Sequence, residues 1–139
     1  MARSCLVVDD SRVVRKVARR ILEAHGCTVA EAGDGQQALD ACRAGLPDFV
    51  LLDWNMPVMD GITFLRLLRK EFGPDNPVVI FCTTENDMAH IEMAIASGAQ
   101  EYIMKPFDDE ILAGKLGQIG VLWLERQALN PPTASLPGS

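Results

Sequence analysis

The chain has 139 residues, 48% of them hydrophobic and 23% charged, which is enough apolar material for one domain with a buried core. Its 19 acidic against 13 basic residues give a formal net charge of −6, which argues against general binding of a nucleic-acid backbone. Four cysteines lie in apolar segments without CxxC spacing, so we expect reduced thiols rather than disulfides or a zinc site. The first apolar run is broken by Asp9 and Asp10 and is too short for a signal peptide or a membrane span.

The first strand and helix are separated by an abrupt change of pattern. Residues 4–8 form an apolar run without alternation, typical of a strand buried on both faces, and the run stops at Asp9 and Asp10. Ser11 is a suitable helix N-cap, and apolar residues then recur at helical spacing until Gly26. The other face of this helix is basic and carries Arg12, Arg15, Lys16, Arg19 and Arg20. Such a face is either a solvated surface or a docking surface for an acidic partner.

The next elements lead to the stretch that organises the chain. A short, weakly alternating outer strand over residues 28–32 is followed by a helix that stops at Gly45. Residues 49–52 are a second continuous apolar run, which ends on Asp53. A turn closed by Gly61 follows at once, so we expect Asp53 where a buried strand leaves the core. Taken alone, such a residue is equally explained as a solvated strand end or a helix cap.

In the second half of the chain, two further strands are each followed by a polar residue. A helix begins at Ile62, and residues 78–82 then form a buried strand that ends on Thr83. After a further helix, residues 102–104 form a short fifth strand that ends on Lys105.

Five strands alternating with five helices predict an α/β fold with a doubly wound parallel sheet. The last helix is expected over residues 108–126, so that residues 1–126 form one domain. We expect residues 127–139 to be a disordered tail, since Pro, Ser and Gly are frequent in it. We therefore expect no DNA-binding or catalytic output domain.

Polar side chains at the strand ends should converge, because the carboxyl ends of parallel strands share one edge of the sheet. These side chains are Asp9, Asp10, Asp53, Thr83 and Lys105. Three carboxylates repel one another unless a cation lies between them, and an all-oxygen cluster suits Mg²⁺. The ammonium and the hydroxyl could bind a phosphoryl group, with a carboxylate available as the nucleophile.

The motifs around these strand ends resemble those of a known family. They are Asp9-Asp10, Leu51-Leu52-Asp53, Asn55-Met56-Pro57, Met59-Asp60-Gly61, Thr83, Tyr102 and Lys105-Pro106-Phe107. Over about residues 4–125 the chain resembles the receiver domain of two-component response regulators, most closely the stand-alone, CheY-like receivers of chemotaxis. This resemblance implies a flavodoxin-like three-layer sandwich with the strand order 2-1-3-4-5.

The resemblance also implies a role for each acidic residue. Asp53 matches the aspartate that accepts a phosphoryl group from the phosphohistidine of a kinase. Asp9 and Asp10 match the pair that holds Mg²⁺, together with Asp53 and the backbone carbonyl of Asn55.

Four further residues match positions that respond to the phosphoryl group. Thr83 and Lys105 match the residues that bind its oxygens after transfer. Tyr102 matches an aromatic switch that turns inward when Thr83 moves. Pro106 matches a proline whose preceding peptide bond is cis in the family.

One position departs from the family pattern and leaves the lifetime of the phosphorylated form open. The residue after Thr83 is usually small, and Thr84 would hinder access of water or of a phosphatase. Asn55 and Glu85, by contrast, match residues of receivers that lose phosphate quickly.

The implied partners are a sensor histidine kinase or a histidine phosphotransfer protein, and a downstream target protein. The target would bind the surface made by the fourth helix, fifth strand and fifth helix, with Met88, Ile91, Tyr102 and Met104 as candidate contacts. We expect a cytoplasmic monomer without a DNA-binding domain or membrane segment. It would not be an enzyme beyond its own phosphorylation and dephosphorylation.

Three other interpretations stay open at this point. The protein could be a phosphate sink or relay intermediate without an output target. It could be a Mg²⁺-dependent phosphohydrolase with an aspartyl nucleophile, although Asn55 stands where such enzymes place a second Asp as general acid. A flavodoxin-like flavin protein is disfavoured, because Asp9 and Asp10 would repel a flavin phosphate.

Overall fold

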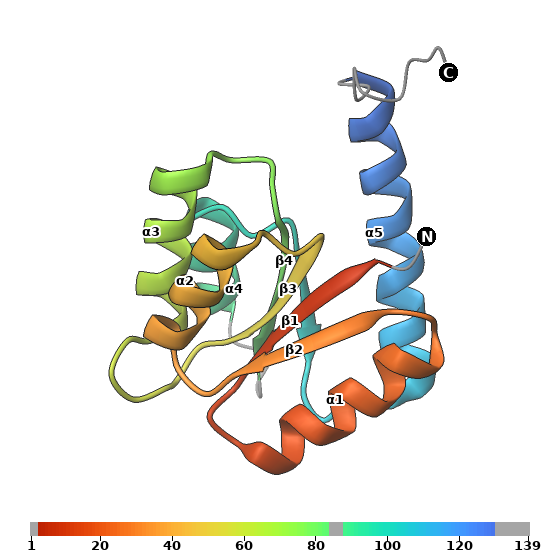
Figure 1. Cartoon of the computed structure of the whole chain (residues 1–139), viewed down its shortest axis with the longest axis horizontal. Coiled ribbons are helices and arrows are strands. Elements are labelled where there is room, and N and C mark those ends of the chain that lie inside the picture. Colours follow the sequence, from red (N-terminus) through yellow and green to blue (C-terminus); the bar gives the residue numbers. More distant parts are fainter. Residues whose placement is uncertain (1–2, 84–87, 130–139) are drawn as a thin grey trace. The chain divides into compact units, whose positions relative to one another are not determined.

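The computed structural model describes the backbone of residues 3–83 and 88–129, and the side chains of these residues up to 120. Within these ranges five strands alternate with five helices (Figure 1). The strands are β1 (Ser4–Val8), β2 (Thr28–Ala32), β3 (Phe49–Asp53), β4 (Val78–Thr83) and β5 (Glu101–Met104). The helices are α1 (Arg12–Ala24), α2 (Gly35–Ala44), α3 (Gly61–Phe72), α4 (Met88–Ala96) and α5 (Asp109–Leu129). The chain divides into two compact units, of which Met1–Phe107 contains the whole sheet and Asp108–Ser139 contains α5.

The strands form one parallel sheet in the order β2-β1-β3-β4-β5. Strand β1 pairs with both β2 and β3, so that Leu6 lies between Ala30 and Val50. Within the first unit, α1 lies on one face of the sheet, and α2, α3 and α4 lie on the other (Figure 1). The structure therefore confirms the predicted doubly wound sheet, the five helices and the flavodoxin-like strand order.

The burial of the strands explains why three of them are continuous apolar runs. Strands β3 and β4 are buried along their whole length, and β1 along all but its first residue, which is typical of the central strands of a parallel sheet. Strand β2 lies at the edge of the sheet and is partly exposed, which accounts for its weaker pattern. Phe64 of α3 and Phe81 of β4 are among the largest buried side chains, and each such burial stabilises the fold by roughly 1.5–3 kcal/mol.

Side-chain caps begin three helices of the first unit. The Ser11 hydroxyl accepts the Val14 N–H at 3.2 Å, as its position before α1 predicted. Asp34 and Asp60 begin α2 and α3 in the same way. Gly26 follows the end of α1 with a φ of 87°, a left-handed conformation that favours glycine. These caps fix where each helix leaves the edge of the sheet.

Three basic side chains of α1 form ion pairs with one carboxylate on β2. Glu31 accepts Arg15 Nε at 3.1 Å, Lys16 Nζ at 3.0 Å and Arg19 Nη1 at 2.7 Å. The hydrogen bond from Arg19, aided by Lys16 and Arg15, lowers the pKa of Glu31 from 4.5 to about 2. Part of the basic run therefore ties α1 to the edge strand, whereas Arg12 and Arg20 are exposed.

The second unit contains α5, which begins at a capping residue. The Asp108 side chain accepts the Ile111 N–H at 2.8 Å, and its carbonyl accepts the Leu112 N–H at 3.0 Å. The helix ends at Leu129, beyond the expected end at Arg126. The predicted disordered tail falls largely on residues 130–139, which lie outside the described residues. Among the described helices, none is both long and apolar enough to span a membrane.

We predict that Glu31→Gln lowers the free energy of unfolding at neutral pH by on the order of 1 kcal/mol, because three cations lose their shared partner. A carboxylate whose pKa is lower in the folded state stabilises the fold above its unfolded pKa, and this contribution disappears as the pH falls. The difference between wild type and variant should therefore be full above pH 4.5 and vanish toward pH 2. Urea unfolding across this pH range measures it, and a pH-independent difference would contradict the assignment.

Candidate functional site

The polar residues at the strand ends meet around one ammonium group. Lys105 follows β5, and its Nζ lies 2.9 Å from Asp9 Oδ2 and 3.1 Å from Asp53 Oδ1. Asp9 follows β1 and is buried, and Asp53 ends β3 with 9% of its surface exposed. Strands that are distant in the sequence thus bring one cation and two carboxylates into direct contact, as expected for the carboxyl edge of a parallel sheet.

A third carboxylate completes an acidic cluster at this edge. Asp9, Asp10 and Asp53 each offer an oxygen, and these oxygens all lie within 4.8 Å of one another. Asp10 is exposed, so the cluster is open to solvent on its side. Oxygen ligands of this kind suit a hard divalent cation such as Mg²⁺. Three carboxylates also exceed the single ammonium in charge, so the donor set fits a bound cation.

Burial and mutual repulsion set the electrostatics of the pair that Lys105 bridges. Burial, and then the charge of Asp9, raise the pKa of Asp53, while Lys105 and the Trp54 N–H act in the opposite direction. Burial lowers the pKa of Lys105, but its hydrogen bond to Asp9 and the charges of both carboxylates raise it overall. The site therefore places an ammonium that holds its proton more firmly than usual against a carboxylate that gives up its proton less readily than usual.

Backbone contacts hold the site residues in place. The Ser11 N–H donates to Asp9 Oδ1 at 2.8 Å, and Arg15 Nη1 donates to the Asp9 carbonyl at 2.6 Å. The Lys105 N–H donates to the Thr83 carbonyl at 2.6 Å, and the Lys105–Pro106 peptide bond is cis. The lysine is thereby anchored to the end of the neighbouring strand.

The turn after β3 contains the residue whose backbone carbonyl the family resemblance assigns to the metal. Asn55 lies in this turn and is exposed. The Gly61 N–H donates to the Trp54 carbonyl at 2.9 Å, which closes the turn. A Cβ at Gly61 would overlap the Asp53 carbonyl oxygen, so only glycine allows α3 to start this close to the acidic cluster.

The two predicted switch residues lie on neighbouring strands. Thr83 is buried at the end of β4, and Tyr102 is half-buried on β5, opposite Phe81 in the register. Tyr102 also packs against the main hydrophobic core. Thr84 and Glu85 lie outside the described residues, so the structure does not bear on their predicted effects.

The candidate partner contacts differ in exposure. Met88 of α4 is 56% exposed, and Met104 of β5 is half-buried. Ile91 is only 5% exposed, because it shares the inward face of α4 with Ala94. Ile91 therefore belongs to the interior and offers little surface to a partner.

Sequence reasoning missed an aromatic contact next to the acidic cluster. The Trp54 ring stacks on His90 of α4, with ring centroids 4.3 Å apart and an interplanar angle of 19°. It also meets Phe81 edge to face, with centroids 5.3 Å apart. No local pattern signals a contact between residues so far apart in the chain.

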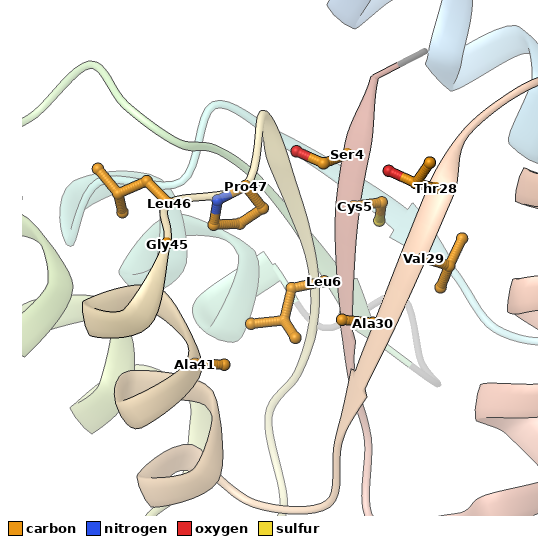
Figure 2. Close-up of a pocket in the computed structure, with 10 residues that line it drawn as sticks. All are labelled: Ser4, Cys5, Leu6, Thr28, Val29, Ala30, Ala41, Gly45, Leu46 and Pro47. Carbon is orange, nitrogen blue, oxygen red and sulfur yellow. The ribbon is translucent and has the colours of Figure 1, made fainter.

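Two surface cavities flank opposite ends of the sheet. A cavity of about 420 Å³ adjoins the acidic cluster and is lined by Val13, Val14, Val17, Lys105, Pro106 and Phe107. A second cavity of about 290 Å³ lies between the first halves of β1 and β2 and the end of α2 (Figure 2). Its lining includes Leu6, Ala30, Ala41 and Pro47, all apolar, and none of the site residues. Only the first of these two cavities is placed to serve the site.

A doubly wound sheet with a lysine-bridged acidic pocket at its carboxyl edge defines a flavodoxin-like α/β domain. Residues 5–116 match the response regulator receiver domain, and the chain belongs to this family. The resemblance inferred from the sequence motifs is thereby confirmed.

Relatives of known name include DNA-binding response regulators that are longer than this chain. The chain is 39% identical over 116 residues to the DNA-binding response regulator MtrA of Mycobacterium leprae and to that of Mycobacterium bovis. The match covers 84% of this chain, which spans about half the length of these curated relatives. The stand-alone character therefore stays a prediction.

Solved structures show the same fold. The chemotaxis response regulator CheY4 of Vibrio cholerae matches with a TM-score of 0.80 and 30% identity, covering 86% of this chain and 99% of that one. The receiver domain of the Francisella response regulator 1452 matches with a TM-score of 0.78 and 27% identity, covering 89% and 98%.

We predict that Gly61→Ala destabilises the protein by about 2–4 kcal/mol, because the new methyl group collides with the Asp53 backbone. Gly45→Ala is the matched control, since nothing lies within 4 Å of a Cβ there. Thermal and urea unfolding compare the two. Equal stability of both variants would show that α3 can shift without strain.

Proposed function

We propose that this chain is a phosphorylation switch in which Asp53 accepts a phosphoryl group from the phosphohistidine of a sensor histidine kinase or histidine phosphotransfer protein. The observation that carries the proposal is the Lys105 ammonium placed between Asp9 and Asp53, beside a third carboxylate. Membership of the receiver domain family supports it. A cytoplasmic location, where kinases meet such domains, is part of the same proposal.

The acidic cluster would hold Mg²⁺ through Asp9, Asp10 and Asp53, with the backbone carbonyl of Asn55. When bound, the ion would neutralise the carboxylates and the charge that develops on the phosphoryl group. The nearness of the three carboxylate oxygens is what supports this assignment.

The proposed transfer uses the carboxylate as nucleophile. An Asp53 oxygen forms a bond to phosphorus while the bond from phosphorus to the donor imidazole nitrogen breaks, leaving a neutral histidine. Lys105 would then bind a phosphoryl oxygen, because its ammonium already lies beside the Asp53 carboxylate. Thr83 would supply a hydroxyl donor from the end of β4, and Tyr102 would repack beside it.

The cavity next to Lys105 gives the phosphodonor a place to bind. Its wall on α1 includes Val13 and Val17, which are exposed, and Arg12 and Arg20 are exposed on the same helix. Apolar side chains with neighbouring cations suit an amphipathic partner helix with acidic residues. We propose that the donor protein docks here. The exposed basic residues of α1 would then form part of a docking surface for an acidic partner, one of the two interpretations that the sequence left open.

The output we propose is a protein target bound through α4 and β5, as in receivers of the chemotaxis type. Met88, Met93 and Ile95 are exposed on α4, an apolar surface typical of a protein interface. The alternative is a phosphate sink or relay intermediate, which needs no such target. We propose no enzymatic activity beyond the protein's own phosphorylation and dephosphorylation.

A Mg²⁺-dependent phosphohydrolase is the competing interpretation from another class. Asn55, which is two residues beyond Asp53, cannot exchange the proton that a leaving alcohol needs. Multiple turnover of a small phosphate ester would favour this class.

Incubation with acetyl phosphate and Mg²⁺ should add one phosphoryl group to the wild-type chain, as measured by intact mass spectrometry. Asp53→Asn should take up none, because an amide is not a nucleophile for this transfer. Chelation by EDTA should suppress the adduct in the wild type. An adduct that persists in Asp53→Asn would remove Asp53 as the acceptor.

Beryllofluoride, which mimics the phosphoryl group, should make the immobilised chain retain a target protein from the lysate of its source cells. Met93→Glu should abolish this retention, since a charge on the apolar face of α4 opposes burial. Leu46→Glu is the control, a similarly exposed apolar residue that lines the distant cavity. Identical retention with and without beryllofluoride would favour the phosphate sink.

A further inference from the structure

Trp54 touches both the phosphoacceptor and helix α4. Its backbone N–H donates to the Asp53 carboxylate, and its ring stacks on His90 with centroids 4.3 Å apart. From this geometry, and resting on the proposed function, we infer that His90 is a positioning residue that acts on Asp53 through Trp54. The aromatic stack then couples the state of Asp53 to the position of α4.

The backbone and the ring of Trp54 are both held by neighbouring residues, so they have little room to move independently. The Trp54 carbonyl accepts the Gly61 N–H at 2.9 Å, and Gly61 leaves no room for even a methyl group against Asp53. The Trp54 ring is also held edge to face by Phe81 of β4, with centroids 5.3 Å apart. A movement of the ring with α4 is therefore transmitted to the peptide group that contacts the carboxylate.

The contact between Trp54 and Asp53 differs between the two states of the site. A carboxylate is a charged acceptor, and its hydrogen bond to the Trp54 N–H is stronger than one to the uncharged acyl oxygen of an aspartyl phosphate. Lys105 Nζ binds the same carboxylate. Phosphoryl transfer to Asp53 therefore changes its contacts with both Trp54 and Lys105. This difference between the states is what an allosteric coupling requires.

The coupling must act in both directions, because linkage is reciprocal. Phosphorylation at Asp53 alters the stack and hence α4. A protein bound to the exposed face of α4 alters the stack in turn, and so changes how Asp53 is held. A target on α4 would thereby change the lifetime of the phosphoryl group without touching it.

The full chain and three variants test the inference. His90→Ala removes the stacked ring. His90→Phe keeps an aromatic ring but removes the nitrogens, which separates stacking from hydrogen bonding by the imidazole. Glu92→Ala is the matched control, since Glu92 is exposed on the same helix and lies outside the apolar surface proposed for the target. Far-UV circular dichroism and thermal unfolding check that each variant is folded.

Two measurements report on the two ends of the coupling. Intact mass spectrometry follows the loss of the phosphoryl group from Asp53 after labelling with acetyl phosphate. Amide resonances of α4 report its response to beryllofluoride and Mg²⁺.

We expect His90→Ala to change the rate of loss by about twofold to tenfold, the range that one aromatic pair supports. His90→Ala should also reduce the change that beryllofluoride and Mg²⁺ cause in the amide resonances of α4. His90→Phe and Glu92→Ala should behave like the wild type in both measurements. A merely structural role of His90 would lower the unfolding temperature without moving either readout.

Wild-type behaviour of His90→Ala in both measurements would overturn this inference and leave the proposed function intact. A loss in His90→Phe as large as that in His90→Ala would also overturn it, because stacking would then not be the cause. A wild-type chain that takes up no phosphoryl group and does not respond to beryllofluoride would overturn the proposed function together with this inference.

Discussion

The site depends on one ammonium group that reaches two carboxylates from a strand that pairs with neither of theirs. In the sheet order β1-β3-β4-β5, the strand before Lys105 is separated from β3 by β4 and from β1 by two strands. The lysine side chain nevertheless lies within 3.1 Å of both Asp9 and Asp53. Without this cation two carboxylates that are nearly excluded from water would face each other, which is strongly unfavourable. The ion pairs therefore link the far strand β5 to the acidic pocket.

This arrangement leaves the pocket with more negative than positive charge. Asp10 adds a third carboxylate at the open side, and one lysine cannot compensate all three. The raised pKa of Asp53 reflects the imbalance, since burial and Asp9 together outweigh Lys105. The excess of negative charge fits a bound cation, which is the basis of the proposed Mg²⁺ site.

The positions of the site residues were accessible from the sequence because each follows a continuous apolar run. Residues 4–8 and 49–52 read as strands buried on both faces, and parallel strands bring Asp9 and Asp53 to one edge. The contacts of Glu31 and of Trp54 were not accessible, since no periodicity encodes which distant side chains meet. For Ile91, the sequence pattern likewise did not show whether the side chain faces the core or the surface. Its inward direction depends on how α4 lies on the sheet, and a short apolar helix presents no clear polar face from which to infer that direction.

Helix α4 is suited to move while the sheet stays fixed. It has nine residues and buries only Ile91 and Ala94, whereas α3 buries five residues, including Phe64 and Leu65. Its exposed side chains are largely apolar, so a partner gains more from binding it than from binding a charged helix. An element with few buried anchors can be shifted by a modest change in free energy, and the strands that hold the acidic pocket cannot. Trp54, which follows Asp53, stacks on this loosely held helix, so under the proposed function a small electrostatic change at Asp53 would suffice to move it.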